Sequence, residues 1–334
     1  MTEHNESNAR KVHVPKRSDV PRRLLQRPSL KHLFKICVID WLIIIASSVL
    51  MTQVSAWFYP LFAMIIGGRL HGLGVIVHDL THTNFRAKPP TFRVIEILCG
   101  YPIGTTIDAM AYHHLRHHKD TLLESDPYFN INKKCSDPMK MWLAFKKSPI
   151  SFFWIARSFV GLFAYYLKPL RNFYARVFLQ DVSGKDLSEH AEVLRCCQED
   201  RFLALVHVGL IALAAQFPIL IWCYYVPLWI EGVFCIYRLM LEHQYELVED
   251  RSVYSLIECT FDHHMGLWGK IFFAPHKIGF HCMHHIHPGV GLHHLPRLRR
   301  WYVENSQAYQ DRNAHMKDVI LAQESPNPSV ARAS

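Results

Sequence analysis

Apolar residues gather in long runs that polar and basic segments separate. The runs 34–59 and 61–82 each approach the ~20 apolar residues that a helix needs to cross a bilayer, and they meet at Tyr59 and Pro60. Two later runs, 202–222 and 228–241, flank a short turn in the same way. The pattern predicts an all-α integral membrane protein with four transmembrane helices in two hairpins.

Two further apolar segments do not have the form of clean spans. Residues 92–112 are broken by Gly100, Pro102 and Gly104, which favours a helix that dips into the membrane and returns. Residues 150–167 carry Arg157 at their centre, which favours an interfacial helix. The segment between them is basic and predicts a surface near anionic lipid, with Lys133, Lys134, Lys140, Lys146 and Lys147.

The two ends of the chain are polar. Residues 1–35 contain nine Lys and Arg and no apolar segment typical of a signal peptide, so we expect the N-terminus to remain cytosolic. Residues 1–31 are predicted to be a disordered basic arm, 32–312 a single membrane domain, and 313–334 a disordered tail. Two hairpins then place the C-terminus, and every histidine cluster described below, on the cytosolic side within a helical cap.

Composition narrows the function. Half of the residues are hydrophobic, the net charge is +9, and the 23 His approach the 28 Asp and Glu in number. With long apolar runs present, the basic excess indicates anionic lipid headgroups and no nucleic acid. The nine Cys form no C-x-x-C pair, which argues against a disulfide scaffold and a thiolate-bound cluster.

Histidines recur at helical spacing beside the apolar runs. Residues three and four apart share one helix face, so each cluster would present its imidazoles together. With one further histidine after the second hairpin, the candidate ligands are His78, His82, His114, His117, His118, His243, His281, His284 and His285. Nine ligands exceed what one six-coordinate ion can use, so two metal ions are predicted, although imidazole alone does not select the metal.

The order of the motifs HDLTH, HLRHH and HCMHH, with a hydrophobic hairpin between the second and the third, resembles the membrane fatty acid desaturase superfamily. The similarity extends over about residues 40–300, and it is greatest to the bacterial branch that includes rhizobitoxine-type desaturases and carotenoid ketolases. It implies two iron ions (Fe2+/Fe3+) held by the nine histidines, with His243 as the additional ligand, and O2 as co-substrate. It also implies a bacterial inner membrane, a lipid or acyl substrate, and an external ferredoxin or reductase as electron donor.

Several further side chains are expected to orient the ligand rings, because metal-bound imidazoles usually donate their second N–H to an acceptor. Proximity along the chain selects Asp79, Asp126, Glu242 and Asp262, and the resemblance adds His276. His113 competes with His114 for the second motif, and HLRHH favours His114. His287, His293 and His294 depart from the apolar or small residues expected there, and His263 and His264 have no clear counterpart.

Breaking an unactivated C–H bond is beyond the basicity of any side chain, so an oxidant derived from O2 is required. The leading prediction is an O2-dependent desaturase that introduces a C=C bond into an acyl lipid or acyl thioester. The first alternative is a hydroxylase or ketolase of a lipid or carotenoid at the same di-iron site. The second is a non-redox membrane metal-binding protein, which the gathering of histidines at one membrane face disfavours.

Overall fold

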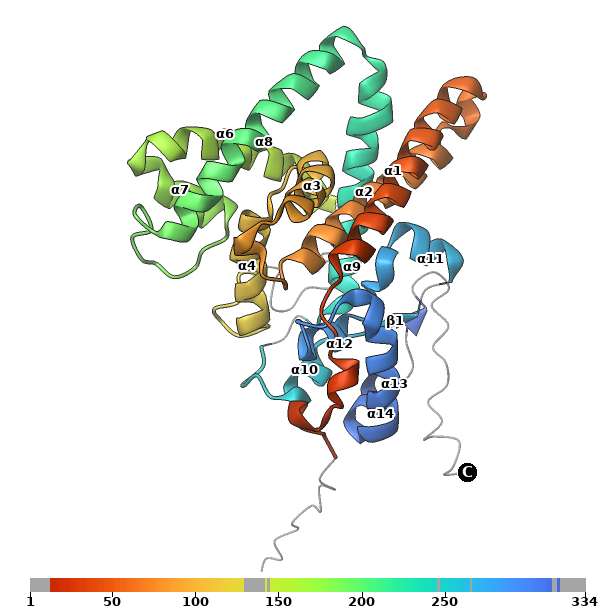
Figure 1. Ribbon diagram of the computed structural model, residues 1–334, viewed down its shortest axis with the longest axis vertical. Helices are drawn as coiled ribbons and strands as arrows, with labels where there is room; N and C mark the ends of the chain where they lie inside the picture. The colour runs from red at the N-terminus through yellow and green to blue at the C-terminus, as the bar shows by residue number, and fades with distance from the viewer. Residues whose placement is uncertain are drawn as a thin grey trace, which may run out of the picture.

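The computed structural model describes residues 13–128, 142, 145–244, 247–264, 266–313 and 317–318. The described chain is helical apart from turns and one pair of two-residue strands (Figure 1). Two helical hairpins project from one side of the molecule, and a group of short helices forms a cap at the other end. The predicted all-α class is confirmed, and the strand pair is the one addition to it among the described residues.

The two hairpins are formed by four largely apolar helices. Helices α1 (Leu30–Gln53) and α2 (Tyr59–Leu80) form the first, and α8 (Ala191–Gln216) and α9 (Val226–Glu242) form the second. Their tips are joined, because the Tyr59 hydroxyl donates a hydrogen bond of 3.2 Å to the carbonyl oxygen of Trp222. Both turns therefore lie on the same side of the molecule, as a two-hairpin topology requires.

Within the part of the chain that the structure describes, two helices are long and apolar enough to cross a membrane, namely α1 and the segment Ala56–Leu80. A third candidate span exists only if the helical segments Pro90–Ile103 and Ile107–Asp120, which meet at a bend of 80°, are counted together as one span. The helices of the second hairpin have other bounds than the apolar runs 202–222 and 228–241 predict, since α8 begins earlier, at Ala191. Helix α8 ends at Gln216, before Pro218, and the chain turns back through a π-helical turn at Ile221–Tyr225. The apolar run 202–222 is therefore not one continuous helix.

The remaining elements surround the hairpins and build the cap. Around the hairpins lie α3 (Pro90–Cys99), α4 (Ile107–Asp120), α6 (Ile150–Tyr166) and α7 (Lys168–Phe178). The cap contains α10 (Val253–Cys259), α11 (Leu267–Phe272), α12 (His281–Ile286), α13 (Leu295–Asn305) and α14 (Gln307–Asn313). Strands β1 (His263–His264) and β2 (Lys317–Asp318) pair in parallel. Short helical turns occupy Arg17–Asp19, Arg22–Leu24, Ala56–Phe58, Phe85–Ala87, Tyr101–Ile103, Pro275–Lys277 and Leu292–His294.

The predicted break at residues 100–104 is present and directs α4. Gly104 has φ +78°, which favours glycine, and a Cβ at Gly100 would lie 2.7 Å from the carbonyl oxygen of Thr105. The Thr106 side chain then accepts a hydrogen bond from the backbone N–H of Ala109 and begins α4. The sharp turn sends α4 back along the end of α2.

Helix α6 was predicted to lie at a membrane surface because Arg157 interrupts its apolar sequence, but the structure gives Arg157 a different role. Arg157 is fully buried and forms an ion pair with Asp200 of α8, with its Nε 2.9 Å from the carboxylate. The Tyr174 hydroxyl donates to the same carboxylate at 2.8 Å. Arg157 therefore joins α6 and α8 inside the protein and does not point to lipid headgroups.

The cap includes part of the predicted N-terminal arm. Val20 is buried against cap residues, and the carbonyl oxygen of Gln26 accepts a hydrogen bond from the N–H of Gly291. The prediction of disorder for 1–31 is therefore wrong for residues 13–31, because this segment covers apolar cap surface. Residues 1–12 and most of the predicted tail 313–334 lie outside the described residues, as do Lys133, Lys134 and Lys140.

Candidate metal centre

The three histidine clusters meet where α2, α4 and α12 converge. His82 follows the end of α2, where Thr81 prolongs the helical turn by donating to the carbonyl oxygen of His78 at 2.7 Å. Helix α12 is short, and its first turn is held by Asp262, whose Oδ1 accepts from the N–H of Cys282 at 2.8 Å. Each helix turns its histidines toward the same space, as the spacing predicts.

Five of the nine predicted ligands form a first group. The group contains five histidines whose ligand nitrogens, one from each ring, all lie within 4.8 Å of one another: His78, His82, His114, His118 and His284. The Nε2 atom of His118 lies 3.0 Å from that of His114 and 2.9 Å from that of His284, and His82 Nε2 lies 3.0 Å from His114 Nε2. This group draws on all three sequence motifs.

The other four form a second group. His117, His243 and His285 offer ligand nitrogens within 4.8 Å of one another. His281 joins them, because its Nε2 lies 3.1 Å from that of His243 and 2.9 Å from that of His285, while His243 and His285 are separated by 3.3 Å. The nine predicted ligands thus lie in two adjoining groups, as two metal ions would require.

Three mutually close ring nitrogens cannot be satisfied by hydrogen bonds alone. A ring nitrogen of a neutral imidazole either donates or accepts, so a triangle of three leaves at least one pair of like atoms facing each other. A cation at the centre removes this conflict. An ion that holds nitrogens at ~2.1 Å, at angles of ~90–109°, brings them to about 3.0–3.4 Å, close to the observed separations. The residues present therefore fit metal ions.

Two of the predicted carboxylates lie beside ligand rings. Asp126 accepts from Nδ1 of His117, with oxygens at 2.9 and 3.0 Å, and among the described residues Nε2 of His117 has no hydrogen-bond partner. Glu242 lies 3.3 Å from Nδ1 of His281 and is itself bonded to Arg238 at 2.6 Å. The hydrogen bond to Asp126 fixes the direction of the His117 ring, whereas Glu242 contacts His281 without a hydrogen bond.

The other three predicted supporting residues act elsewhere. Asp262 caps α12, and Asp79 accepts from the N–H of Leu292 at 3.4 Å, which ties α2 to the turn after α12. His276 lies 2.7 Å from Asp40, which also pairs with Arg69 at 3.0 Å. This contact joins the cap to the first hairpin and leads away from the nine rings.

The structure distinguishes His114 from His113. His114 lies within the first group, whereas Nδ1 of His113 lies 2.6 Å from the Tyr128 hydroxyl. Sequence reasoning missed Tyr128, whose ring also stacks on His117 with centroids 4.3 Å apart. It missed Thr121 as well, whose hydroxyl lies 3.1 Å from Nδ1 of His285. Thr121 follows the second motif by three residues and Tyr128 by ten, and this proximity along the chain is the only sequence signal for them.

The unexplained histidines near the third motif are outside both groups. His287 lies 2.8 Å from the Tyr302 hydroxyl, and His293 stacks on His32 with centroids 4.2 Å apart. His294 packs on His293. His263 is buried in β1 and donates its backbone N–H to Gly279. These residues join the cap to the N-terminal segment and to neighbouring turns.

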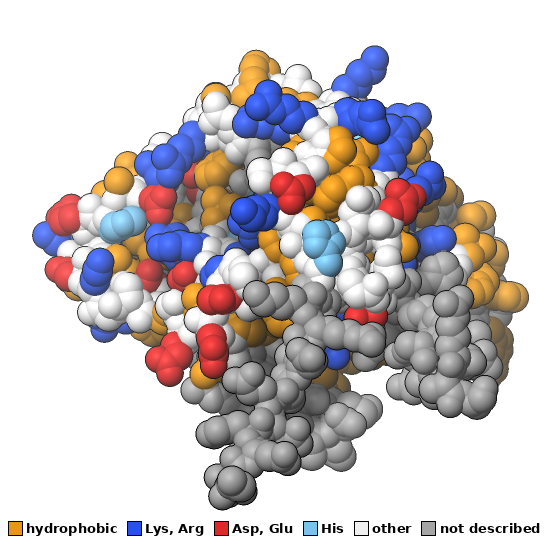
Figure 2. Space-filling model, turned by 90° about the horizontal axis from the view of Figure 1, so that it is seen from below, with side chains coloured by type: hydrophobic (Ala, Val, Ile, Leu, Met, Phe, Trp, Pro, Cys, Tyr) orange, Lys and Arg blue, Asp and Glu red, His pale blue; other side chains and the backbone are white. Residues whose placement is uncertain are grey.

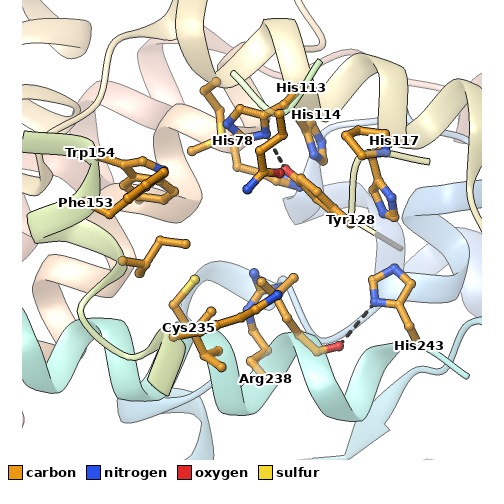
Figure 3. A pocket seen from close by; sticks show the side chains of 18 of the residues that line it. His78, His113, His114, His117, Tyr128, Phe153, Trp154, Cys235, Arg238 and His243 are labelled. Atoms are coloured by element: carbon orange, nitrogen blue, oxygen red, sulfur yellow. Dashed lines mark hydrogen bonds between the residues drawn. The ribbon is translucent and has the colours of Figure 1, made fainter. Parts of the chain in front are cut away.

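A cavity of about 640 Å³ borders the centre (Figure 3). His78, His113, His114, His117 and His243 lie around one part of it, and Phe153 and Trp154 close another. Lys146, Lys147 and Arg176 contribute basic groups to the lining, and buried Glu231, bonded to Ser151 at 2.5 Å, supplies an acidic one. The cavity therefore joins the histidines to a mainly apolar lining that also carries a few charged side chains.

Comparison of the sequence with models of known protein families gives one match. The family model "Fatty acid desaturase" matches residues 55–317, which includes all nine histidines. The chain therefore belongs to the fatty acid desaturase family. No curated protein matches it.

Replacing Asp126 by Asn is expected to weaken iron binding about 10- to 100-fold, because His117 loses the charged acceptor that orients it. A competition titration with a chelator measures the change. Asp250→Asn is the matched control, since Asp250 accepts from the backbone N–H of Ser252, as Asp126 does from that of Leu122, but is exposed and outside both histidine groups. Equal affinity in the two variants would show that Asp126 does not support a ligand.

Burial lowers the pKa of His281, His284 and His285 well below the ordinary 6.5, and neighbouring histidines lower it further. The unfolded chain takes up protons as pH falls through 6.5, whereas these folded rings do not. The free energy of unfolding of the metal-free protein should therefore be constant above about pH 7.5 and decrease below pH ~6.5. Denaturant unfolding at pH 8, 6.5 and 5 tests this, and equal stability at all three would contradict buried neutral rings.

Proposed function

We propose that this protein is an O2-dependent di-iron desaturase that introduces a C=C bond into an acyl lipid or acyl thioester. The observation that carries the proposal is the pair of adjoining histidine groups beside a cavity, in a member of the fatty acid desaturase family. The balanced reaction consumes one O2, two electrons and two protons for each double bond and releases two waters. The electrons come from an external donor.

Each part of the chain has a defined task in this proposal. Bound iron would supply the oxidising power, drawn from O2, that an unactivated C–H bond requires. The nine imidazoles hold the metal while neutral, and Asp126 orients His117. The apolar side chains of Phe153 and Trp154 pack against the substrate chain and exclude water from it.

The proposal includes four membrane spans and a cytosolic centre. Joined hairpin tips support spans that enter and leave from the same side. The opposite face, formed by the cap, carries many Lys and Arg side chains with Asp and Glu between them (Figure 2). Such a face suits water and anionic headgroups, and the nine Lys and Arg of residues 1–35 favour its cytosolic placement.

Oxygen insertion by the same centre, as a hydroxylase or ketolase, is the second candidate. Buried Glu231 favours it, because a carboxylate in the cavity wall suits a substrate with a hydroxyl or another polar group better than a plain hydrocarbon tail.

Mass spectrometry of lipids from a host that expresses the chain decides between the two. Products lighter by two hydrogens are expected, with none in cells that carry the vector alone. Products that gain oxygen instead would overturn desaturation and support the second candidate. An unchanged lipid profile in cells whose protein contains two irons would refute both reactions on the host's lipids.

A further inference from the structure

His82 is the exception among the nine histidines. The other eight are buried, whereas His82 is partly exposed. Its ring lines a second hollow of about 490 Å³, which shares no lining residue with the cavity described above. The first cavity uses His113, His114 and His117 of α4, and the second uses Ala111, Tyr112 and Leu115. The centre is therefore approached from two different faces of α4.

The second hollow is basic. Arg86, Arg116 and Arg195 all gather around one carboxylate, that of Glu192, at 3.0, 2.9 and 3.9 Å. Asp108 also lines the hollow and lies 2.6 Å from Lys88 and 3.9 Å from Arg195. Three guanidinium groups against two carboxylates in the lining leave one positive charge in excess, and Arg86 and Arg195 keep 65% and 43% of their side-chain surface exposed at the rim. Such a rim attracts acidic partners and repels metal cations.

We infer that this hollow, lined by His82 and the three arginines, is the docking site of a small acidic protein that carries a one-electron iron–sulfur cluster. The inference rests on the proposed function, which requires external electrons. Electron transfer slows steeply with distance, so the donor must approach the ligand ring that lies nearest the surface. That ring is His82, whose Nε2 lies 3.0 Å from His114 Nε2 inside the first group.

The two-sided arrangement also explains how substrate and donor bind together. A lipid in the first cavity lies against His78, His114 and His117 and leaves the His82 side open. At each encounter the reduced cluster of the donor would give up one electron, and iron held by His82 and the other ligands would accept it. Two encounters supply the two electrons of one turnover. A contact of this kind is small and transient, so charge complementarity governs its rate more than buried area does.

The test uses the full chain in lipid nanodiscs and a plant-type ferredoxin as the acidic probe. The double variant Arg86→Glu/Arg195→Glu reverses the rim charge, and Arg297→Glu/Arg300→Glu, on the exposed side of α13, makes the same change in net charge elsewhere. Binding of oxidised ferredoxin should weaken about tenfold or more in the rim variant and stay within about twofold in the α13 variant. Salt should weaken wild-type binding, because exposed charges are screened.

Reduction kinetics provide the second measurement. Stopped-flow reduction of the ferric protein by ferredoxin should slow about tenfold or more in the rim variant, whereas reduction by the methyl viologen radical cation should not slow. Arg86→Gln/Arg195→Gln should give a smaller change in the same direction, and unchanged iron content and helicity verify its fold.

The docking site would be refuted if ferredoxin binding weakened equally in the rim and α13 variants, or if the wild-type chain did not bind ferredoxin. Binding is measured without turnover, so failure of desaturation in the lipid analysis remains a separate result.

Discussion

Replacing His284 by Ala is expected to abolish product formation while the hairpins still insert into the membrane. His284 is fully buried, its Nε2 lies 2.9 Å from His118 Nε2, and its ring lies 4.6 Å from that of His78. Loss of this ligand should reduce turnover more than about a hundredfold, because even residues that only support a ligand contribute 10- to 100-fold. Product yield per mole of purified protein measures the effect.

His190→Ala is the control for that variant, since His190 is exposed and outside both groups. It should retain wild-type yield. Circular dichroism of the His284→Ala protein should retain its helical signal, which separates loss of the centre from loss of the fold. Wild-type yield from His284→Ala would remove it from the ligand set.

Substitution of the adjacent residues His113 and His114 is expected to give opposite results for iron content. His114→Ala should lose iron from the first group, because the His114 ring contacts His78, His82 and His118. His113→Ala should keep the iron and lose only the contact with Tyr128. Iron per chain, measured on both purified variants, tests the assignment with each variant as the control for the other.

Iron loss from His113→Ala with full iron in His114→Ala would reverse the assignment of the second motif. Activity adds a further distinction. His113 lines the cavity, so its replacement should change the Michaelis constant for substrate more than the iron content.

The site could be predicted from the sequence because its geometry is local. The i, i+3, i+4 spacing fixes which imidazoles share a helix face, and this holds for α4 and α12 whatever surrounds them. Parity of the hairpins then brings the clusters to one end of the molecule. His243 could be placed with them because it follows the return leg of the second hairpin and because the family resemblance implies an additional ligand there.

Contacts between distant segments could not be predicted. The pair Arg157 and Asp200 is separated by 43 residues, and His276 and Asp40 by 236, so no periodicity relates them. A central Arg in an apolar helix is compatible with lipid headgroups or with a buried partner, and the sequence does not distinguish the two. The packing of residues 13–29 on the cap was missed for the same reason, because a few scattered apolar residues such as Val20, Leu24 and Leu25 show no periodicity that predicts a distant contact.

The C-terminal end of α8 was predicted too late for a different reason. Apolar composition continues through Phe217 and Pro218, but proline restricts the residue before it and ends the helix there. Composition therefore predicted the existence of the second hairpin better than the extent of its helices.

Metal content of the purified, membrane-extracted protein tests the central claim most directly. The two histidine groups predict two iron ions per chain, and His284→Ala should contain fewer. Elemental analysis that finds two irons in the wild-type protein agrees with the account. Stoichiometric zinc without iron, or no bound metal after expression with added iron, would contradict it.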